Sequence, residues 1–175
     1  APDWTMGISN TLRYRNLSLS FLIDVRYGGV MYSGTVSDLR VNGMAEETIG
    51  KNRTDIVDKG VKQDGTENTT AITPYQFWSN NYSSKVSEAN VFDATFVKLR
   101  EMVLSYQMPQ RWFKNCFIGS LALGVEGRNL WLMKSNVPHI DPETNIFGPS
   151  AVGSGVEYSA IPTTRSWGFN IKLTF

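Results

Sequence analysis

The sequence predicts an all-β fold, specifically an antiparallel transmembrane β-barrel segment of about five long strands. Three observations support this. Apolar and polar residues alternate over five segments, the connections between the segments alternate in length, and aromatic residues mark the segment ends. The predicted strands cover residues 4–15, 17–28, 95–107, 117–129 and 158–175. The long connections, residues 29–94 and 130–157, are expected to be external loops.

The C-terminal stretch shows the alternation most clearly. Every second position is large and apolar, namely Trp167, Phe169, Ile171, Leu173 and Phe175, while the positions between them are small or polar. Because successive side chains of a strand point to opposite faces, one face of this strand is apolar. A soluble sheet would cover that face with a second layer of protein, whereas lipid covers it in a membrane barrel.

Residues 4–15 and 17–28 are predicted to form a hairpin through the short connection Arg15-Asn16. In the first segment the apolar residues lie at even positions, with Asn10 as the interruption, and in the second they lie at odd positions. They are Trp4, Met6, Ile8, Leu12 and Tyr14, followed by Leu17, Leu19, Phe21, Ile23, Val25 and Tyr27. Gly28-Gly29 ends the second strand.

The third and fourth segments alternate less regularly. In residues 95–107 the apolar positions change parity near Arg100, and either a change of facing or a β-bulge would explain this. In residues 117–129 one face carries Phe117, Leu121, Leu123 and Val125, and the other is small and polar. Before them, residues 30–94 are long, polar and irregular, apart from a short helix expected to begin with Thr73 as N-cap and Pro74 at its first position.

Connection lengths support a membrane barrel. Residues 15–16 and 108–116 are short connections, and residues 29–94 and 130–157 are long ones. If the last strand ends in the periplasm, both short turns lie there and both long loops lie outside, as in bacterial barrels. Five strands cannot close a barrel. The chain is therefore expected to be part of a larger one, whose other strands lie N-terminal to Ala1 or on another chain.

Composition argues against several other classes. The net charge of +1 does not indicate nucleic-acid binding. His139 is the single histidine and Cys116 the single cysteine, so neither a histidine-based zinc cluster nor an intrachain disulfide is expected. No catalytic constellation or phosphate-binding loop stands out from chance, so we expect no enzyme activity, no cofactor and no metal.

Several stretches resemble SusC/RagA-family TonB-dependent transporters, and they occur in consistent order along the chain. They are residues 2–7 (PDWTMG), 16–21 (NLSLSF), 93–101 (DATFVKLRE), 104–106 (LSY), 127–131 (GRNLW), 140–143 (IDPE) and 162–175 (PTTRSWGFNIKLTF). Residues 30–92 match poorly, which suits a variable external loop.

The resemblance implies the C-terminal portion of a 22-stranded outer-membrane barrel that is occluded by an N-terminal plug, which lies outside this chain. It implies import of glycans or peptides (an oligosaccharide or peptide substrate) together with a SusD-like surface lipoprotein. The further partners it implies are the remainder of the barrel, the plug, TonB acting through the plug rather than through this segment, and outer-membrane lipid. No nucleic acid is implied.

Candidate contact residues lie in and near the two long loops. Tyr75 and Trp78, with Phe77 and Tyr82, could stack on sugar rings or could anchor the core of their own loop. Trp131, His139, Asp141 and Glu143 follow the predicted fourth strand and could contact substrate or lipoprotein, although Asp141-Pro142 is also an ordinary turn sequence. The resemblance further implies that Phe169, Ile171, Leu173 and Phe175 form the signal read by the barrel-assembly machinery.

Two other interpretations remain open at this stage. One is a passive porin or structural barrel segment, which a plug domain upstream would distinguish from an importer. The other is a soluble β-sandwich that binds carbohydrate, which dependence on detergent would distinguish.

Overall fold

The computed structural model describes residues 1–50, 54–114, 117–146 and 155–175. These residues form two compact units. The strand unit comprises Pro2–Gly29, Ala94–Asn136 and Thr163–Phe175. The loop unit comprises Val30–Asp93 and Val137–Pro162, together with Ala1.

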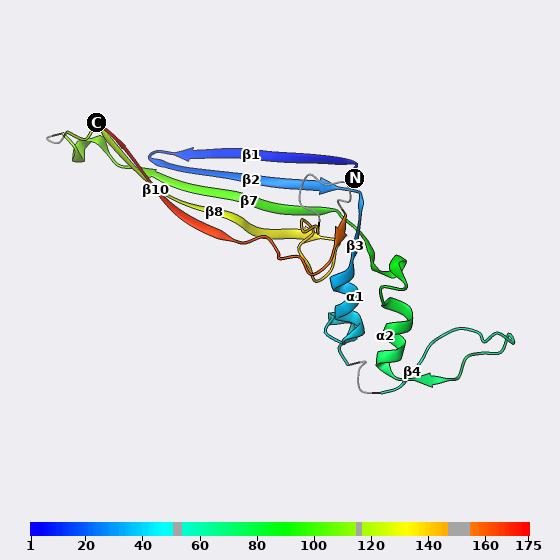
Figure 1. The fold of residues 1–175 in the computed structure, drawn as a ribbon. Helices are drawn as coiled ribbons and strands as arrows, with labels where there is room; N and C mark the ends of the chain where they lie inside the picture. The colour runs from blue at the N-terminus through cyan, green and yellow to red at the C-terminus, as the bar shows by residue number, and fades with distance from the viewer. Residues whose placement is uncertain (51–53, 115–116, 147–154) are drawn as a thin grey trace. The chain divides into compact units, whose positions relative to one another are not determined.

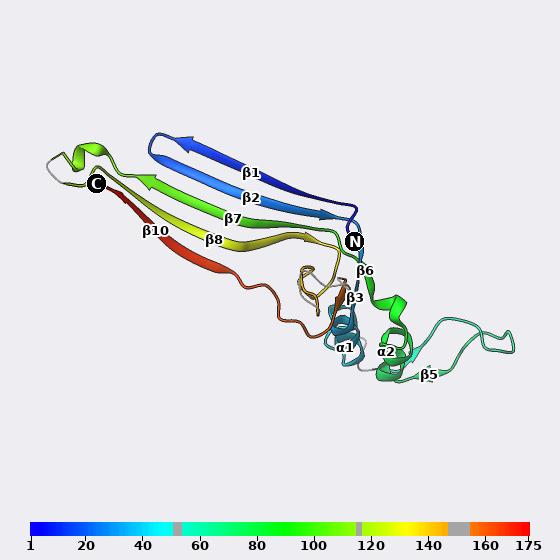
Figure 2. The ribbon, with the colours of Figure 1, turned by 45° about the horizontal axis from the view of Figure 1, so that its top comes forward.

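The strand unit contains one antiparallel sheet of five strands in the order β1-β2-β7-β8-β10, shown side by side in Figures 1 and 2. Each strand pairs with the one before and the one after it along this order, so the sheet is an up-and-down meander. The strands are β1 (Trp4–Tyr14), β2 (Leu17–Tyr27), β7 (Phe96–Gln107), β8 (Ser120–Ser135) and β10 (Ser166–Thr174). The predicted fold class is confirmed.

The predicted bounds of the last two strands were wrong. The predicted end at Asn129 is an irregularity in pairing, because β8 continues to Ser135 and pairs there with Phe96. Asn129 has a left-handed φ of 52° and lies where the register between β7 and β8 shifts. β10 begins at Ser166 rather than at residue 158, and Thr163 just before it is held by a 2.9 Å hydrogen bond from Lys98 Nζ.

A β-bulge in β7 explains the change of parity near Arg100. Leu22 pairs with Glu101, but the next residue, Ile23, pairs with Leu99, so Arg100 is the extra residue. The bulge therefore brings the even apolar residues after it and the odd ones before it onto the same face. Of the two explanations that the sequence left open, the bulge is the one observed.

The register gathers most of the large apolar side chains of the five strands on one face, because residues that are paired across strands share a face. One such row runs Ile171, Leu123, Tyr106, Leu17 and Tyr14. We call this the apolar face, and its residues are Trp4, Met6, Ile8, Leu12, Tyr14, Leu17, Leu19, Phe21, Ile23, Val25, Tyr27, Val97, Leu99, Met102, Leu104, Tyr106, Leu121, Leu123, Val125, Trp131, Trp167, Phe169, Ile171 and Leu173. The opposite, polar face includes Arg13, Ser18, Ser20, Asp24, Arg26, Lys98, Glu101, Ser105, Glu126, Arg128, Asn170 and Lys172.

The apolar face is open along β10. Phe169 is 86% exposed, Ile171 67% and Leu173 45%. In water, leaving such side chains uncovered forgoes roughly 1.5–3 kcal/mol of burial energy for each of them. The arrangement is that of a single layer whose apolar side is covered by something other than the described part of this chain.

The described part of the loop unit contains helices and short strands, which corrects the expectation of an irregular loop. Ser33 caps α1 (Gly34–Val41) by accepting a hydrogen bond from the Val36 amide, and Thr73 caps α2 (Pro74–Tyr82) in a capping box with Gln76. The predicted Thr73-Pro74 helix start is confirmed. The remaining elements are β3 (Val30–Ser33), η1 (Glu46–Thr48), β4 (Ile56–Val57), β5 (Ala71–Ile72), η2 (Ser87–Asn90), β6 (Val91–Asp93) and β9 (Val156–Glu157).

The order of the short strands shows that the two long loops associate. β3 pairs with β6 in antiparallel fashion and with β9 in parallel fashion, so β9 from the second loop completes a sheet begun by the first. A further short 3₁₀ turn, η3 (Gln110–Trp112), lies in the β7–β8 connection of the strand unit. None of the described helices combines the length and apolar character that crossing a membrane requires.

Candidate functional site

The aromatic residues of α2 form a cluster inside the loop unit. The ring centroids of Trp78 and Tyr82 lie 4.9 Å apart, and Phe77 meets Trp78 edge to face at 5.3 Å. Trp78 is only 4% exposed, so its ring supports the loop core and is not presented to solvent. Tyr75, one turn away and outside this cluster, is 63% exposed and has a ring free to meet a ligand.

Arg40 of α1 joins the cluster to the rest of the unit. Its guanidinium lies 5.1 Å from the Tyr82 ring centroid and 5.3 Å from that of Phe92. Nη1 donates to the Ala89 carbonyl at 2.8 Å, and Nε donates to Glu47 Oε1 at 2.6 Å. A nearly buried arginine with these partners fixes α1, η1 and η2 together.

His139 reaches this network from the second loop. Its Nε2 lies 2.7 Å from Glu47 Oε2, so Glu47 is held on both oxygens. Partial burial by itself would raise the pKa of the Glu47 carboxyl. Hydrogen bonds from Arg40, the backbone and His139, together with the positive charge of Arg40, outweigh that effect and lower the pKa from 4.5 to about 2.

Acidification is expected to loosen this joint between the loops. A carboxyl whose pKa is lowered by folding contributes stability that is present above its ordinary pKa of 4.5 and is lost as the pH falls towards 2. We expect Glu47→Gln to cost about 1 kcal/mol at neutral pH, since the pair is partly exposed, and to flatten the acid dependence of loop stability. Hydrogen exchange of the α1 amides between pH 5 and 2.5 measures this. Glu46→Gln, the exposed neighbour, is the control and should leave the profile unchanged.

Of the other predicted contact residues of this region, Asp141 and Glu143 lie in one turn of the loop unit, whereas Trp131 belongs to the strand unit. Asp141 forms a turn with Pro142: its Oδ1 accepts from the Glu143 amide at 3.1 Å, and its carbonyl accepts from Thr144 Oγ1 at 2.7 Å. The expected placement of Trp131 after the fourth strand was wrong, because it lies within β8. There it is paired with Leu99, on the apolar face.

Sequence reasoning missed the buried carboxylate of Glu157. It is 1% exposed and accepts hydrogen bonds from Ser33 Oγ and Thr35 Oγ1, both at 2.6 Å, and from the Ala160 amide at 3.1 Å. Glu157 thereby ties the second loop to the start of α1. No local signal reveals it, because Ser33 and Glu157 are 124 positions apart.

The polar face of the sheet carries paired charges around the bulge. Arg100 forms an ion pair with Asp24 and donates to Asn129 Oδ1 at 3.1 Å, and Asn129 Nδ2 donates in turn to the Thr164 carbonyl. Arg128 Nε lies 3.7 Å from Glu101 Oε2. These charges suit a water-filled or protein-filled interior and not hydrocarbon, where an arginine near mid-depth costs about 2–4 kcal/mol. Across the described ranges, no group of three or more acidic, histidine or cysteine side chains is placed to hold a metal.

The four residues of the predicted assembly signal lie together at one end of the chain. Phe169, Ile171 and Leu173 share the apolar face of β10, and the ring of Phe175 stacks on that of Phe117 with centroids 5.7 Å apart. All four are exposed.

No protein-family model matches the chain, but curated relatives do. TonB-dependent receptor P3 of Formosa agariphila is 25% identical over 178 residues, which cover 99% of this chain and 16% of that protein. TonB-dependent receptor P26 of the same organism is 26% identical over 177 residues, covering 99% and 17%. The chain thus spans about a sixth of the length of the curated relatives it matches.

Solved structures show the same fold. The RagAB peptide importer in its open-open state matches with a TM-score of 0.67 at 20% identity, over 100% of this chain and 17% of the other. Its closed-closed state matches with a TM-score of 0.61 at 19% identity, over 100% and 17%. The sequence resemblance is confirmed: the chain is homologous over nearly its whole length to a segment of TonB-dependent receptors, and it has the fold of part of a RagA-type barrel.

Proposed function

We propose that this chain is a barrel-wall and external-loop segment of a SusC-like TonB-dependent outer-membrane importer of glycans or peptides. The observation that carries the proposal is the single-layer sheet with an uncovered apolar face, found in a chain homologous to such receptors. In a membrane, lipid covers the apolar face of such a sheet, and no second layer of protein is needed.

The two faces of the sheet have different tasks in this proposal. The apolar face meets hydrocarbon, and the polar face lines the lumen and meets the plug. On that inner side the two charges cancel within each of the pairs Asp24–Arg100 and Glu101–Arg128. The wall therefore presents fixed hydrogen-bonding groups without a large net electric field. The remaining strands, up to the 22 that the resemblance implies, and the plug belong to the complete protein.

Topology places both long loops at one end of the sheet. β2 and β8 both end beside the start of β7, where Arg26 and Ser135 pair with Phe96, and β10 begins opposite Arg128 of β8. The short connections, from β1 to β2 and from β7 to β8, leave the strands at the other end. In a bacterial outer membrane the end with long loops faces outward. We infer that the loops meet the SusD-like lipoprotein and the substrate there, with exposed Tyr75 a better contact than buried Trp78.

Force transmission is assigned to other parts of the protein. TonB is proposed to act through the plug and not through this segment, and Phe169, Ile171, Leu173 and Phe175 are proposed to form the assembly signal. We include peptides as well as glycans among the proposed substrates because the matched solved structures are of a peptide importer.

Two alternatives make different predictions. A passive porin segment would allow diffusion that needs no TonB. A soluble carbohydrate-binding sandwich requires a second layer over the apolar face, and the exposure of Phe169 and Ile171 argues against it.

Uptake assays on the complete protein test the proposal. Cells that express it should accumulate labelled oligosaccharide or oligopeptide, and loss of TonB or of the proton gradient should reduce that accumulation at least tenfold. A TonB-independent rate would favour the passive porin. Recovery of the protein without detergent in the soluble fraction would contradict both membrane interpretations.

A further inference from the structure

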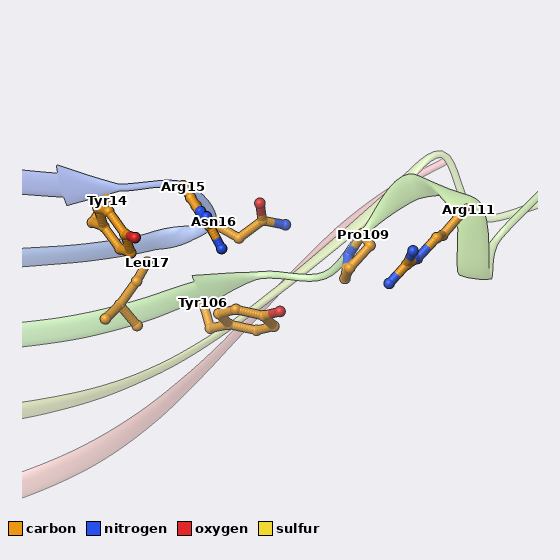
Figure 3. Close-up of a pocket in the computed structure, with 7 residues that line it drawn as sticks. All are labelled: Tyr14, Arg15, Asn16, Leu17, Tyr106, Pro109 and Arg111. Carbon is orange, nitrogen blue, oxygen red and sulfur yellow. The ribbon is translucent and has the colours of Figure 1, made fainter.

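A pocket of about 590 Å³ lies at the short-turn end of the strand unit (Figure 3). Its lining comes from the β1–β2 turn, from the end of β7 and from the segment that contains η3, and consists of Tyr14, Arg15, Asn16, Leu17, Tyr106, Pro109 and Arg111. From this lining we propose that the pocket binds the phosphate-bearing headgroup of an anionic phospholipid.

The lining combines two positive charges with apolar walls. Arg15 and Arg111 are exposed, no acidic side chain lines the pocket, and among the described residues neither arginine has an ion-pair partner. Guanidinium groups bind phosphate oxygens in a bidentate manner. Tyr14, Leu17 and Tyr106 belong to the apolar face, so an acyl chain attached to that phosphate can continue along the face towards Leu104.

The turn holds Arg15 in a costly backbone conformation. Its φ is 52°, in the left-handed region where Gly, Asn or Asp are usual, and a non-glycine residue there costs about 1–2 kcal/mol. Strain of this kind at a residue with a free charge indicates a role beyond folding. The Arg15 guanidinium also lies 5.4 Å from the centroid of the Tyr14 ring, which places it beside the apolar wall.

Hydrogen bonds fix the pocket in advance of ligand. The Gln107 amide donates to the Asn16 carbonyl at 2.7 Å, and Asn16 Nδ2 donates to the Gln107 carbonyl at 2.6 Å. The Met108 amide donates to the Leu121 carbonyl at 2.8 Å. The turn and the exit of β7 are thus joined, so binding requires little ordering of backbone.

A lipid fits these features better than free phosphate. Free phosphate gains nothing from three apolar side chains, whereas a phospholipid uses both parts of the pocket. Tyrosines at the ends of barrel strands mark the depth at which headgroups lie, and arginines there attract anionic lipid. The inference rests on the proposed barrel function, since it requires that lipid cover the apolar face.

Native mass spectrometry of the complete protein tests the proposal, with phosphatidylglycerol, phosphatidylcholine and inorganic phosphate as separate probes in detergent. Phosphatidylglycerol should remain bound more strongly than phosphatidylcholine, and inorganic phosphate should not compete at equal concentration. Each of Arg15→Gly and Arg111→Gln should weaken phosphatidylglycerol binding about fivefold, the effect expected of one arginine near an anionic surface. Arg15→Gly also relieves the backbone, so a folding defect is not expected to obscure the result.

Arg13→Gln is the matched control. It removes the same charge two positions away, but its side chain belongs to the polar face, opposite Ser18. Equal loss of lipid for Arg13→Gln and Arg15→Gly would overturn the proposal, as would equal binding of the two lipids or displacement by phosphate. A protein that needs detergent but shows no lipid preference would refute the lipid-binding proposal without contradicting the proposed barrel function. A protein that is soluble without detergent would refute both.

Discussion

Replacing Ile171 with arginine is expected to destabilise the membrane-inserted protein by about 2–4 kcal/mol, which is the cost of an arginine facing lipid near mid-depth. Ile171 lies on the apolar face of β10, midway between Trp167 and Phe175, and is 67% exposed. On a soluble protein, an exchange at so exposed a position would change stability by no more than about 0.5 kcal/mol. The two environments therefore predict clearly different results.

Equilibrium unfolding of the complete protein in phospholipid vesicles measures this cost. Asn170→Arg is the control, because it places the same side chain one residue away, on the polar face opposite Gly124. It should cost less than 1 kcal/mol. A neutral Ile171→Arg variant, or equal costs at both positions, would show that lipid does not cover this face.

Replacing Glu157 with alanine is expected to destabilise the loop unit by about 3 kcal/mol. The substitution leaves the hydroxyls of Ser33 and Thr35 and the Ala160 amide without their buried acceptor. It also frees Ser33, the N-cap of α1, from one of its two hydrogen bonds. We therefore expect the α1 amides to exchange with solvent roughly 100-fold faster, provided that they exchange through opening of this unit.

Two further variants test whether loss of the buried carboxylate causes the faster exchange. Glu157→Gln keeps the shape and one carbonyl acceptor, so its effect should lie between those of wild type and Glu157→Ala. Glu67→Ala removes an exposed acid from the same unit and should leave exchange unchanged. Unchanged exchange in Glu157→Ala would mean that other contacts, such as the β3–β9 pairing and the His139–Glu47 contact, hold the two loops together without Glu157.

The five long strands could be predicted from sequence because each has an apolar side and a polar side. Apolar and polar residues therefore alternate along most of each strand. The disturbance near Arg100 could be located but not interpreted, since a bulge and a change of facing produce the same pattern within one strand. Only the pairing of Ile23 with Leu99 distinguishes them. The end of β8 was predicted too early because apolar and polar residues no longer alternate over residues 130–133, although pairing with β7 resumes at Trp131, beyond the left-handed Asn129.

The loop unit was less predictable because contacts distant in sequence hold it together. The start of α2 could be predicted from the neighbouring residues Thr73 and Pro74. The short strand β9, by contrast, forms by pairing with β3, which is distant in sequence. The same holds for candidate contacts. An aromatic sequence around Trp78 does not tell whether the rings face inward or outward, and the structure places Trp78 inside and Tyr75 outside.

The most direct test of the central claim, that lipid covers the apolar face, uses spin labels at positions 169, 170, 171 and 172 in turn. The complete protein, with Cys116 and any other cysteine replaced by serine, would be reconstituted in phospholipid bilayers. The label's collision rates with oxygen and with a water-soluble nickel complex would then be compared. The account predicts alternation, with oxygen favoured at 169 and 171 and nickel favoured at 170 and 172. Equal access of the nickel complex at all four positions would contradict it.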